Sequence, residues 1–375
     1  MPEAGDTLSE TLLASALRGQ MIPTPPRVEW AELLASAEEH GVLPLLADTA
    51  AVACWDPDFL VAMRPSVAAE IALSLVRERE LGRVLASLAA AAITPLLLKG
   101  AHLAFTLYRS PDRRPRLDTD LLIKEKDRDG LKTCLASLGY RPTPHVTGEV
   151  AFTQFHYSRI DESGASHALD IHWRIAVPKL FADRLTFDDL RRDAVAVPRL
   201  GRHALAPSPP HALLVACLHR TAHHGTTTRL LWLYDIHLLA TTLSDRDWHT
   251  VVERADLSGL TPVVVAGLEH AGARLGTVVP ASVLARLRAA NVIVESDMRA
   301  FLQGTPSQIQ VAASDWRRIA GVSARLQFLR EHVFPPASYM RHRYRSSSRA
   351  VLPFLYAHRA VTGAVKWLKE GVRQS

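Results

Sequence analysis

The 375-residue chain is poor in cysteine and in aromatic side chains. Its three cysteines are Cys54, Cys134 and Cys217, and aromatic residues make up only 6% of the sequence. An odd number of widely spaced cysteines among apolar neighbours argues against a disulfide framework or a zinc knuckle, so we expect reduced, buried thiols. Few aromatics beside many alanines and leucines favour helices over a β-sandwich or barrel.

Long apolar runs without a charge are also missing. Because no 18 uncharged apolar residues follow one another, the sequence predicts no transmembrane segment. The first residues are acidic and lead into no secretory apolar region, so we expect a cytoplasmic protein. The net charge of +6 suits an anionic substrate without requiring nucleic acid.

Acidic residues are absent from one long stretch near the C-terminus, between Glu331 and Glu370. The stretch contains seven basic residues and three tyrosines, namely Arg341, Arg343, Arg345, Arg349, Arg359, Lys366, Lys369, Tyr339, Tyr344 and Tyr356. Such a segment could contact RNA or an anionic membrane, although a run of like charges is more often a solvated face. Nucleic acid therefore remains a possible partner through this basic C-terminal stretch.

The hydrophobic pattern divides the chain into three regions. Residues 1–92 and 206–375 have the periodicity of helices, and prolines separate the N-terminal helices expected at 8–18, 28–40, 58–64 and 67–91. In residues 93–205, short strands alternate with helices; the strands are expected at 93–100, 117–124, 150–160 and 167–175, with a short pair over 193–205. The prediction is an α+β fold, in which a small mixed sheet is flanked by an N-terminal helical region and a larger C-terminal one.

Three aspartates are the candidate catalytic residues. Asp118 and Asp120 lie two residues apart on a predicted strand, so their side chains share a face at a spacing of about 7 Å. Asp170 lies between Leu169 and Ile171, an unfavourable place for a lone charge. A divalent cation shared by carboxylates from two neighbouring strands would account for all three. The alternative is a surface pair and one ion-paired aspartate in the core.

This arrangement suits phosphoryl-type transfer from a nucleotide. Two Mg²⁺ ions a few ångström apart can activate an attacking oxygen and neutralise a leaving pyrophosphate. Upstream, Lys99 and Gly100 end a predicted strand before a helix, where backbone N–H groups and an ammonium can bind a triphosphate.

At these positions the sequence resembles the uncharacterised nucleotidyltransferases of the DNA polymerase β superfamily. The motifs that carry the resemblance are Lys99-Gly100, Tyr108, Arg114, Asp118-Thr119-Asp120 and Asp170-Ile171-His172-Trp173. The wider superfamily enters its first helix with Gly-Gly or Gly-Ser, whereas this chain has Lys99-Gly100-Ala101.

The resemblance implies a nucleotidyltransferase that moves an NMP from an NTP to an acceptor and releases pyrophosphate. It implies Asp118, Asp120 and Asp170 as catalytic and metal-binding residues, with two Mg²⁺ ions or, alternatively, Mn²⁺. The residues expected to bind the nucleotide are Lys99, Gly100, Arg114, His172 and His223. A small molecule or a peptide is the favoured acceptor. The alternatives are a toxin-like enzyme acting on tRNA or protein, and a non-catalytic nucleotide-binding module.

Several of these residues also have simpler interpretations. Lys99 could simply lie at a strand end with its ammonium in solvent, and Arg114 could belong to a solvated basic loop. His172 could be a structural histidine. His219 and His223 have the i, i+4 spacing of zinc ligands, but Arg220 stands where a zinc protease needs a glutamate, which argues against zinc. His223 could instead form a wall of the active site.

Overall fold

The computed structural model describes most of the chain. Cys54 lies outside the described part, and Cys134 and Cys217 are free thiols, the latter buried. The described residues are 7–49, 55–144, 150–224, 229–289, 294–304, 306–346 and 348–372.

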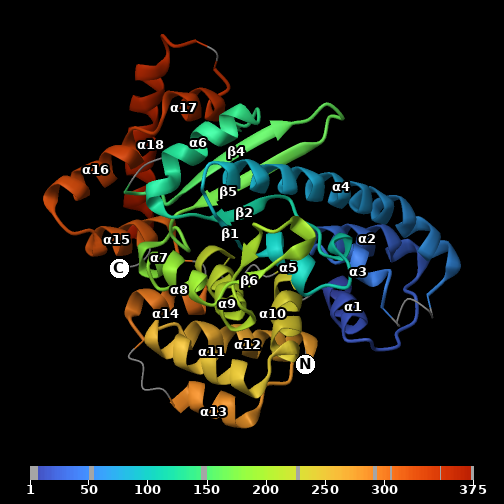
Figure 1. Ribbon diagram of the computed structural model, residues 1–375. Helices are drawn as coiled ribbons and strands as arrows, with labels where there is room; N and C mark the ends of the chain where they lie inside the picture. The colour runs from blue at the N-terminus through green and yellow to red at the C-terminus, as the bar shows by residue number, and fades with distance from the viewer. Residues whose placement is uncertain are drawn as a thin grey trace.

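A seven-stranded mixed sheet lies at the centre of a mostly helical molecule (Figure 1). The spatial order is β3-β4-β5-β2-β1-β7-β6, in which β2–β5 and β1–β7 are the parallel pairs. The strands are β1 (Leu96–Leu97), β2 (Thr119–Leu122), β3 (Arg141–Pro142), β4 (Gln154–Ile160), β5 (Ser166–His172), β6 (Val195–Ala196) and β7 (Leu205–Ala206). The predicted α+β fold with helical flanks is confirmed, although β1 and β2 are shorter than the expected 93–100 and 117–124.

The N-terminal helices are α1 (Leu8–Leu17), α2 (Trp30–Glu39), α3 (Leu43–Leu46) and α4 (Pro57–Ala90). The expected break between 58–64 and 67–91 is wrong, because α4 continues through Pro65. Proline removes one helical hydrogen bond. Phe59 and Met63, within the two turns before Pro65, are buried in the same core as the later helices, and this packing offsets the loss.

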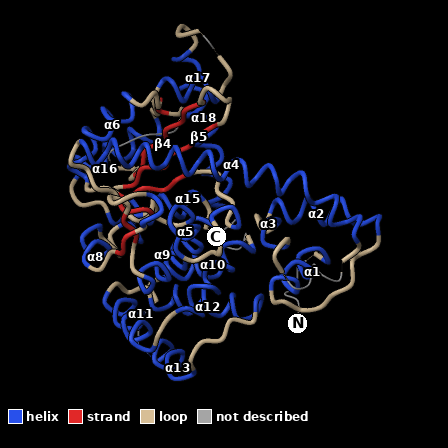
Figure 2. Tube along the Cα trace, turned by 45° about the vertical axis from the view of Figure 1, so that its right-hand side comes forward, coloured by secondary structure: helices blue, strands red, loops and turns tan. Residues whose placement is uncertain are grey.

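The remaining helices lie between the strands and in the C-terminal region. They are α5 (Gly100–Thr106), α6 (Arg128–Ser137), α7 (Lys179–Ala182), α8 (Phe187–Arg192), α9 (Pro209–His224), α10 (Leu230–Thr242), α11 (Asp245–Leu257), α12 (Thr261–Leu275), α13 (Ala281–Ala289), α14 (Ser296–Gln303), α15 (Gln308–Arg318), α16 (Val322–Val333), α17 (Ala337–Arg343) and α18 (Leu352–Val372). Short 3-10 segments cover Arg27–Glu29, Pro111–Arg113, Glu125–Asp127 and Pro198–Leu200. Figure 2 shows α9–α13 on one side of the strands and α6 on the other.

Each face of the sheet is covered by its own hydrophobic core. Leu121 and Ile171 pack with α4 and α6 on one face, whereas Leu122 packs with α9 and α10 on the other. Because side chains alternate along a strand, Asp120 shares the face of Leu122. Asp170 lies on that face too, because it alternates with Ile171. The strand pattern therefore directs the acidic residues toward the C-terminal helices.

The prediction of no transmembrane segment considered only uncharged runs. By length and composition alone, α4 is long and apolar enough to span a membrane, with a mean hydropathy of 1.6 over 18 residues. In the second half of α4, Leu81, Leu85 and Leu88 are buried in the core that also contains Leu121 and Ile171. That half of α4 is thus a core helix of the sheet.

Burial of Asp315 predicts a pH-dependent stability. Asp315 is 5% exposed, accepts a hydrogen bond from the Lys179 backbone N–H at 2.8 Å, and has its pKa raised to about 6 by burial. Its folded pKa therefore exceeds the ordinary value of 3.8, so the folded state binds the proton more tightly. The stability that protonated Asp315 contributes is full below about pH 4 and is lost as the pH rises through about 6.

Asp315→Asn keeps an acceptor for Lys179 but cannot ionise. We expect the free energy of unfolding of the wild type, relative to the variant, to fall by about 1–3 kcal/mol between pH 4 and pH 7. Urea unfolding of both proteins over this range measures the difference. A difference that does not change with pH would show that the Asp315 carboxyl is not held in its neutral form.

Candidate active site

The candidate site is built on the parallel pairing of β2 with β5. In this register Asp120 lies beside Asp170, and Leu122 lies beside His172. Ligand atoms of Asp120, Asp170 and His172 all lie within 4.8 Å of one another. The structure therefore brings together two of the three predicted carboxylates and also His172, which we had expected to contact the nucleotide.

Asp118 lies one residue before β2 and borders the same cavity. Asp118 is exposed by surface area, yet its position in the cavity lining partly desolvates its carboxylate. Burial and then repulsion by Asp120 and Asp170 raise the pKa of Asp118 to about 6. The three predicted carboxylates are therefore close enough to repel one another, and a bound cation would offset this repulsion.

Asp120 has the most charge compensation of the three. Its Oδ1 accepts hydrogen bonds from Lys99 Nζ at 2.7 Å and from His172 Nε2 at 2.9 Å. Burial opposes ionisation of Asp120, but Lys99 and His172 together hold its pKa well below the usual range. The buried ion pair with Lys99 thus lies at Asp120, inside the carboxylate group.

Two histidines support the carboxylates. Burial lowers the pKa of His172, so its ring is neutral and donates Nε2–H to Asp120. The buried Nδ1 of His172 has no hydrogen-bond partner among the described residues. His156 on β4 lies opposite Asp170, with Nδ1 2.6 Å from Asp170 Oδ1. Sequence reasoning missed His156, because its only signal was a strand position whose partner depends on the register.

The donor set fits a divalent cation. Carboxylate oxygens are the ligands that Mg²⁺ prefers, and an imidazole nitrogen beside them also suits Mn²⁺. Burial and then repulsion by the other carboxylates raise the pKa of Asp118, and a bound cation would relieve this repulsion. Asp120 and Asp170 are the carboxylates of the described group that could hold the ion, and Asp118 borders the same cavity.

The turn before α5 has an unusual backbone. Lys99 has φ 50° and ψ −134°, a conformation that costs a residue with a side chain about 1–3 kcal/mol. The next residue, Gly100, lies against Arg114, and a Cβ added at Gly100 would be 2.6 Å from Arg114 Nη1. A side chain at residue 100 would therefore displace the arginine. The Lys-Gly motif reflects both this close approach and the ion pair of Lys99.

Arg114 is engaged by the C-terminal helices. Its Nη2 and Nε donate to the Asp235 carboxylate of α10 at 2.6 and 3.2 Å, and Tyr108 Oη donates to Asp235 at 2.7 Å. The interpretation of a solvated basic loop is wrong for Arg114 and Arg116, which are only 7% and 5% exposed. Asp235 thus joins α10 to the end of α5 and to the loop before β2.

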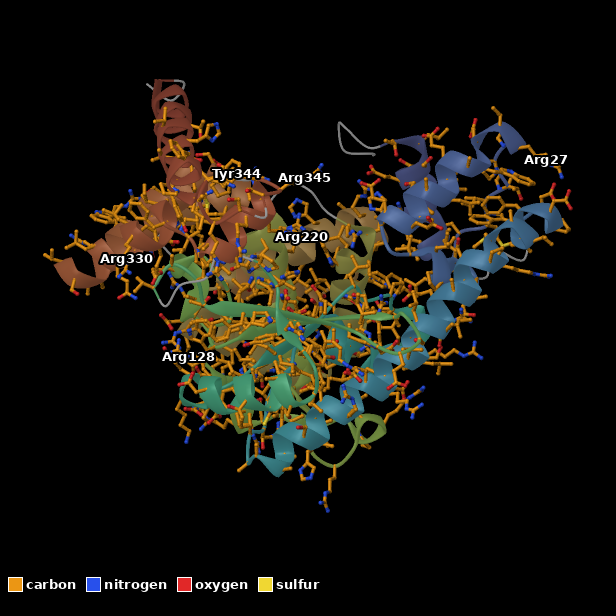
Figure 3. All side chains as sticks on the ribbon, turned by 90° about the horizontal axis from the view of Figure 1, so that it is seen from above. Arg27, Arg128, Arg220, Arg330, Tyr344 and Arg345 are labelled. Atoms are coloured by element: carbon orange, nitrogen blue, oxygen red, sulfur yellow. The ribbon has the colours of Figure 1, made fainter. Side chains whose placement is uncertain are left out.

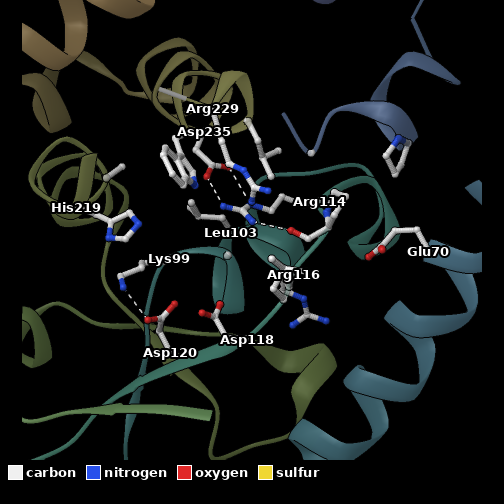
Figure 4. A pocket seen from close by; sticks show the side chains of 18 of the residues that line it. Glu70, Lys99, Leu103, Arg114, Arg116, Asp118, Asp120, His219, Arg229 and Asp235 are labelled. Carbon is white, nitrogen blue, oxygen red and sulfur yellow. Dashed lines mark hydrogen bonds and ion pairs between the residues drawn. The ribbon is translucent and has the colours of Figure 1, made fainter. Parts of the chain in front are cut away.

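A cavity of about 620 Å³ lies above the carboxylates, between α4 on one side and α9 and α10 on the other. Figure 4 shows Asp118 and Asp120 at its floor, His219 and Arg229 on the side of α9 and α10, and Glu70 across from them on α4. His223, Lys99, Gly100 and Arg114 also line it. Within the described residues, the group able to hold a metal is Asp120, Asp170 and His172, and the pair His219 and His223 is not part of it.

The basic C-terminal stretch makes internal contacts. Arg359 lies over the Tyr339 ring at 5.6 Å, and Tyr356 Oη donates to the Pro335 carbonyl at 2.6 Å. Figure 3 shows Tyr344 and Arg345 in the C-terminal group of helices, far from Arg27 in the N-terminal group. The side chains of residues 366 and 369 lie outside the described part. Nucleic-acid contact through this stretch stays a prediction.

Gly100→Ala tests the contact between the turn and Arg114. We expect it to destabilise the fold by about 1–3 kcal/mol, because the guanidinium cannot retreat without breaking its bonds to Asp235. Gly82→Ala on α4 is the matched control, since a Cβ there meets nothing within 4 Å and alanine favours a helix. Combining Gly100→Ala with Arg114→Lys should cost less than the sum of the single changes in urea unfolding. Strict additivity would contradict the contact.

Comparisons with known proteins found similar solved structures. Two solved structures from Helicobacter pylori are similar to the chain. One, described as a candidate nucleotidyltransferase, is 14% identical, and the match covers 61% of this chain and 94% of that one. The other, JHP933, is 12% identical, and the match covers 68% of this chain and 94% of JHP933. Both have a TM-score of 0.32. No curated protein matches the chain.

The model of one protein family matches residues 26–276, which include the whole sheet, the carboxylates and the helices α9 and α10. This match covers more than half of the chain. The chain therefore belongs to the family of uncharacterised nucleotidyltransferases.

Proposed function

We propose that the protein transfers a nucleoside monophosphate from an NTP to an acceptor and releases pyrophosphate, with its metal ions held by Asp118, Asp120 and Asp170. The observation that carries this proposal is the pairing of Asp120 with Asp170 in one strand register, at the floor of a cavity that Asp118 also borders. Aspartates that served only to stabilise the fold would not be expected to converge there, because each raises the cost of ionising the others.

The reaction requires charge neutralisation and a proton acceptor. When bound, two Mg²⁺ ions would supply the positive charge that offsets the developing charge on the phosphates. Asp170 is the proposed residue on the acceptor side that helps remove the proton of the attacking group. The hydrogen bond from His156 to Asp170 Oδ1 orients this carboxylate and leaves its second oxygen for the site.

For the nucleotide we propose contacts with the basic and aromatic side of the cavity. His223 and Arg229 line this side, and Lys99 lies beside Asp120 at the floor. Arg114 and His172 contribute indirectly, since their side chains donate hydrogen bonds to Asp235 and Asp120. Gly100 contributes by allowing Arg114 to lie against the turn.

The acceptor is proposed to be a small molecule or a short peptide. A cavity of about 620 Å³, closed on one side by α4, falls in the usual size range of small-molecule sites, about 300–1,000 Å³. None of the contacts of the basic C-terminal stretch described above favours tRNA or a protein as the acceptor.

Metal-dependent nucleotide binding is the first test, because it does not require the acceptor. We expect calorimetry to detect binding of at least one NTP with Mg²⁺ and to lose it with EDTA. Asp120→Asn should weaken this binding by about tenfold or more, because the cation loses a charged ligand. Asp161→Asn is the control: Asp161 pairs with His167 at 2.9 Å at the far end of the β4–β5 hairpin. Equal NTP binding with Mg²⁺ and with EDTA would contradict the proposal.

Turnover separates an enzyme from a non-catalytic binding module. With candidate acceptors supplied, we expect wild-type protein to release pyrophosphate, Asp170→Asn to lose at least about 100-fold in rate, and Asp161→Asn to retain the wild-type rate. Asp170→Asn can still accept the hydrogen bond of His156, so it should keep the fold. Full turnover by Asp170→Asn would show that Asp170 has no role in the reaction.

A further inference from the structure

We propose that Lys99 is an internal counter-ion of the catalytic carboxylates, which makes metal binding depend on the nucleotide. In this proposal, Lys99 holds Asp120 in the free enzyme and releases it when an NTP offers its phosphates to the ammonium. The proposal deepens the proposed function and rests on it.

The first observation is competition for one oxygen. Asp120 Oδ1 accepts from Lys99 Nζ at 2.7 Å and from His172 Nε2 at 2.9 Å, so two donors already approach it. A Mg²⁺ ion coordinates a carboxylate oxygen at about 2.0–2.1 Å. The ammonium cannot remain at hydrogen-bond distance from the same oxygen without strong repulsion from the ion, because the pair is largely shielded from water. Metal binding at Oδ1 therefore requires Lys99 to move.

The second observation is that the side chain of Lys99 has somewhere to go. Lys99 lines the cavity and remains partly accessible, with 16% of its side chain exposed, whereas Asp120 is almost fully buried. An NTP in this cavity would bring several negative oxygens near the ammonium. Moving from one carboxylate oxygen to these phosphates keeps the lysine paired while it frees Asp120.

The third observation is the backbone of Lys99. Its φ of 50° is in the region that favours glycine, so a side chain at this position has a conformational cost. Ala101 N–H donates to Leu98 O at 3.0 Å, and Leu103 N–H donates to Lys99 O at 3.0 Å, which keeps the turn in this shape. The strained backbone holds the start of the lysine side chain beside Asp120, so only the flexible end needs to move.

Two binding equilibria are therefore coupled. A metal ion alone must displace the ammonium with no new partner for it, whereas a metal ion with the nucleotide provides that partner. By linkage, the nucleotide raises the affinity for the metal by the same factor as the metal raises the affinity for the nucleotide. Without the lysine, this coupling should be small.

Mn²⁺ affinity measured by electron paramagnetic resonance tests the proposal without turnover. The proteins are the wild type, Lys99→Met, Lys99→Gly and Lys99→Arg, each titrated with and without an α,β-methylene NTP analogue that the wild type binds. Lys99→Gly removes the charge and also suits the positive φ of this position. It therefore tests the loss of charge even if Lys99→Met folds poorly. Lys99→Arg keeps the charge and is the matched control.

We expect Lys99→Met and Lys99→Gly to bind Mn²⁺ alone about tenfold more tightly than the wild type, and the gain from the nucleotide to shrink by about the same factor. Lys99→Arg keeps a positive charge beside Asp120, so it should bind Mn²⁺ alone less tightly than the two uncharged variants do. If both uncharged variants bind Mn²⁺ alone no better than the wild type, the counter-ion role is overturned and the proposed function stands. If wild-type protein binds no Mn²⁺ with any nucleotide, both proposals fail.

Discussion

The register of β5 against β2 is the constraint on which the site depends. The parallel pairing places Asp120 beside Asp170 and Leu121 beside Ile171, so each sheet face receives a uniform set of side chains. A slip of one residue would turn Asp170 and His172 into the core of Leu121 and Leu131 and expose Ile171 on the cavity side. Burying an unpaired carboxylate in that core is strongly unfavourable. The hydrophobic pattern that stabilises the sheet is thus the same pattern that assembles the carboxylates.

A second constraint joins the sheet to the C-terminal helices. Asp235 on α10 is almost fully buried and accepts hydrogen bonds from Arg114 and Tyr108, which flank the loop between α5 and β2. Breaking one member of such a pair leaves an uncompensated buried charge, which typically costs about 3–5 kcal/mol. Since Gly100 lies against Arg114, the position of the turn depends on a helix more than 120 residues later in the chain. The walls and the floor of the cavity are therefore positioned together.

Much of this architecture could be predicted from the sequence, because its signals are local. The two-residue spacing of Asp118 and Asp120, and the apolar neighbours of Asp170, predict carboxylates that share one side of a sheet. The features that were missed depend on long-range contacts. His156 contacts Asp170 only through the β4–β5 register, and Arg114 appears solvated until α10 supplies Asp235. The continuation of α4 through Pro65 was missed for the same reason, since packing of Phe59 and Met63 outweighs a local signal that normally ends a helix.

The ion pair of Lys99 also bears on how the chain folds. Carboxylates that converge without compensation would destabilise the folded state, and a site of this kind could make folding depend on the metal, as structural zinc sites do. Here Lys99 and the neutral His172 already satisfy Asp120, and His156 satisfies one oxygen of Asp170. Asp118 carries the remaining repulsion, and its pKa of about 6 lets it reduce that repulsion by taking up a proton in mildly acidic solution. Side chains thus compensate the acidic cluster during folding. The affinity for the metal ion can therefore follow what nucleotide binding and catalysis require.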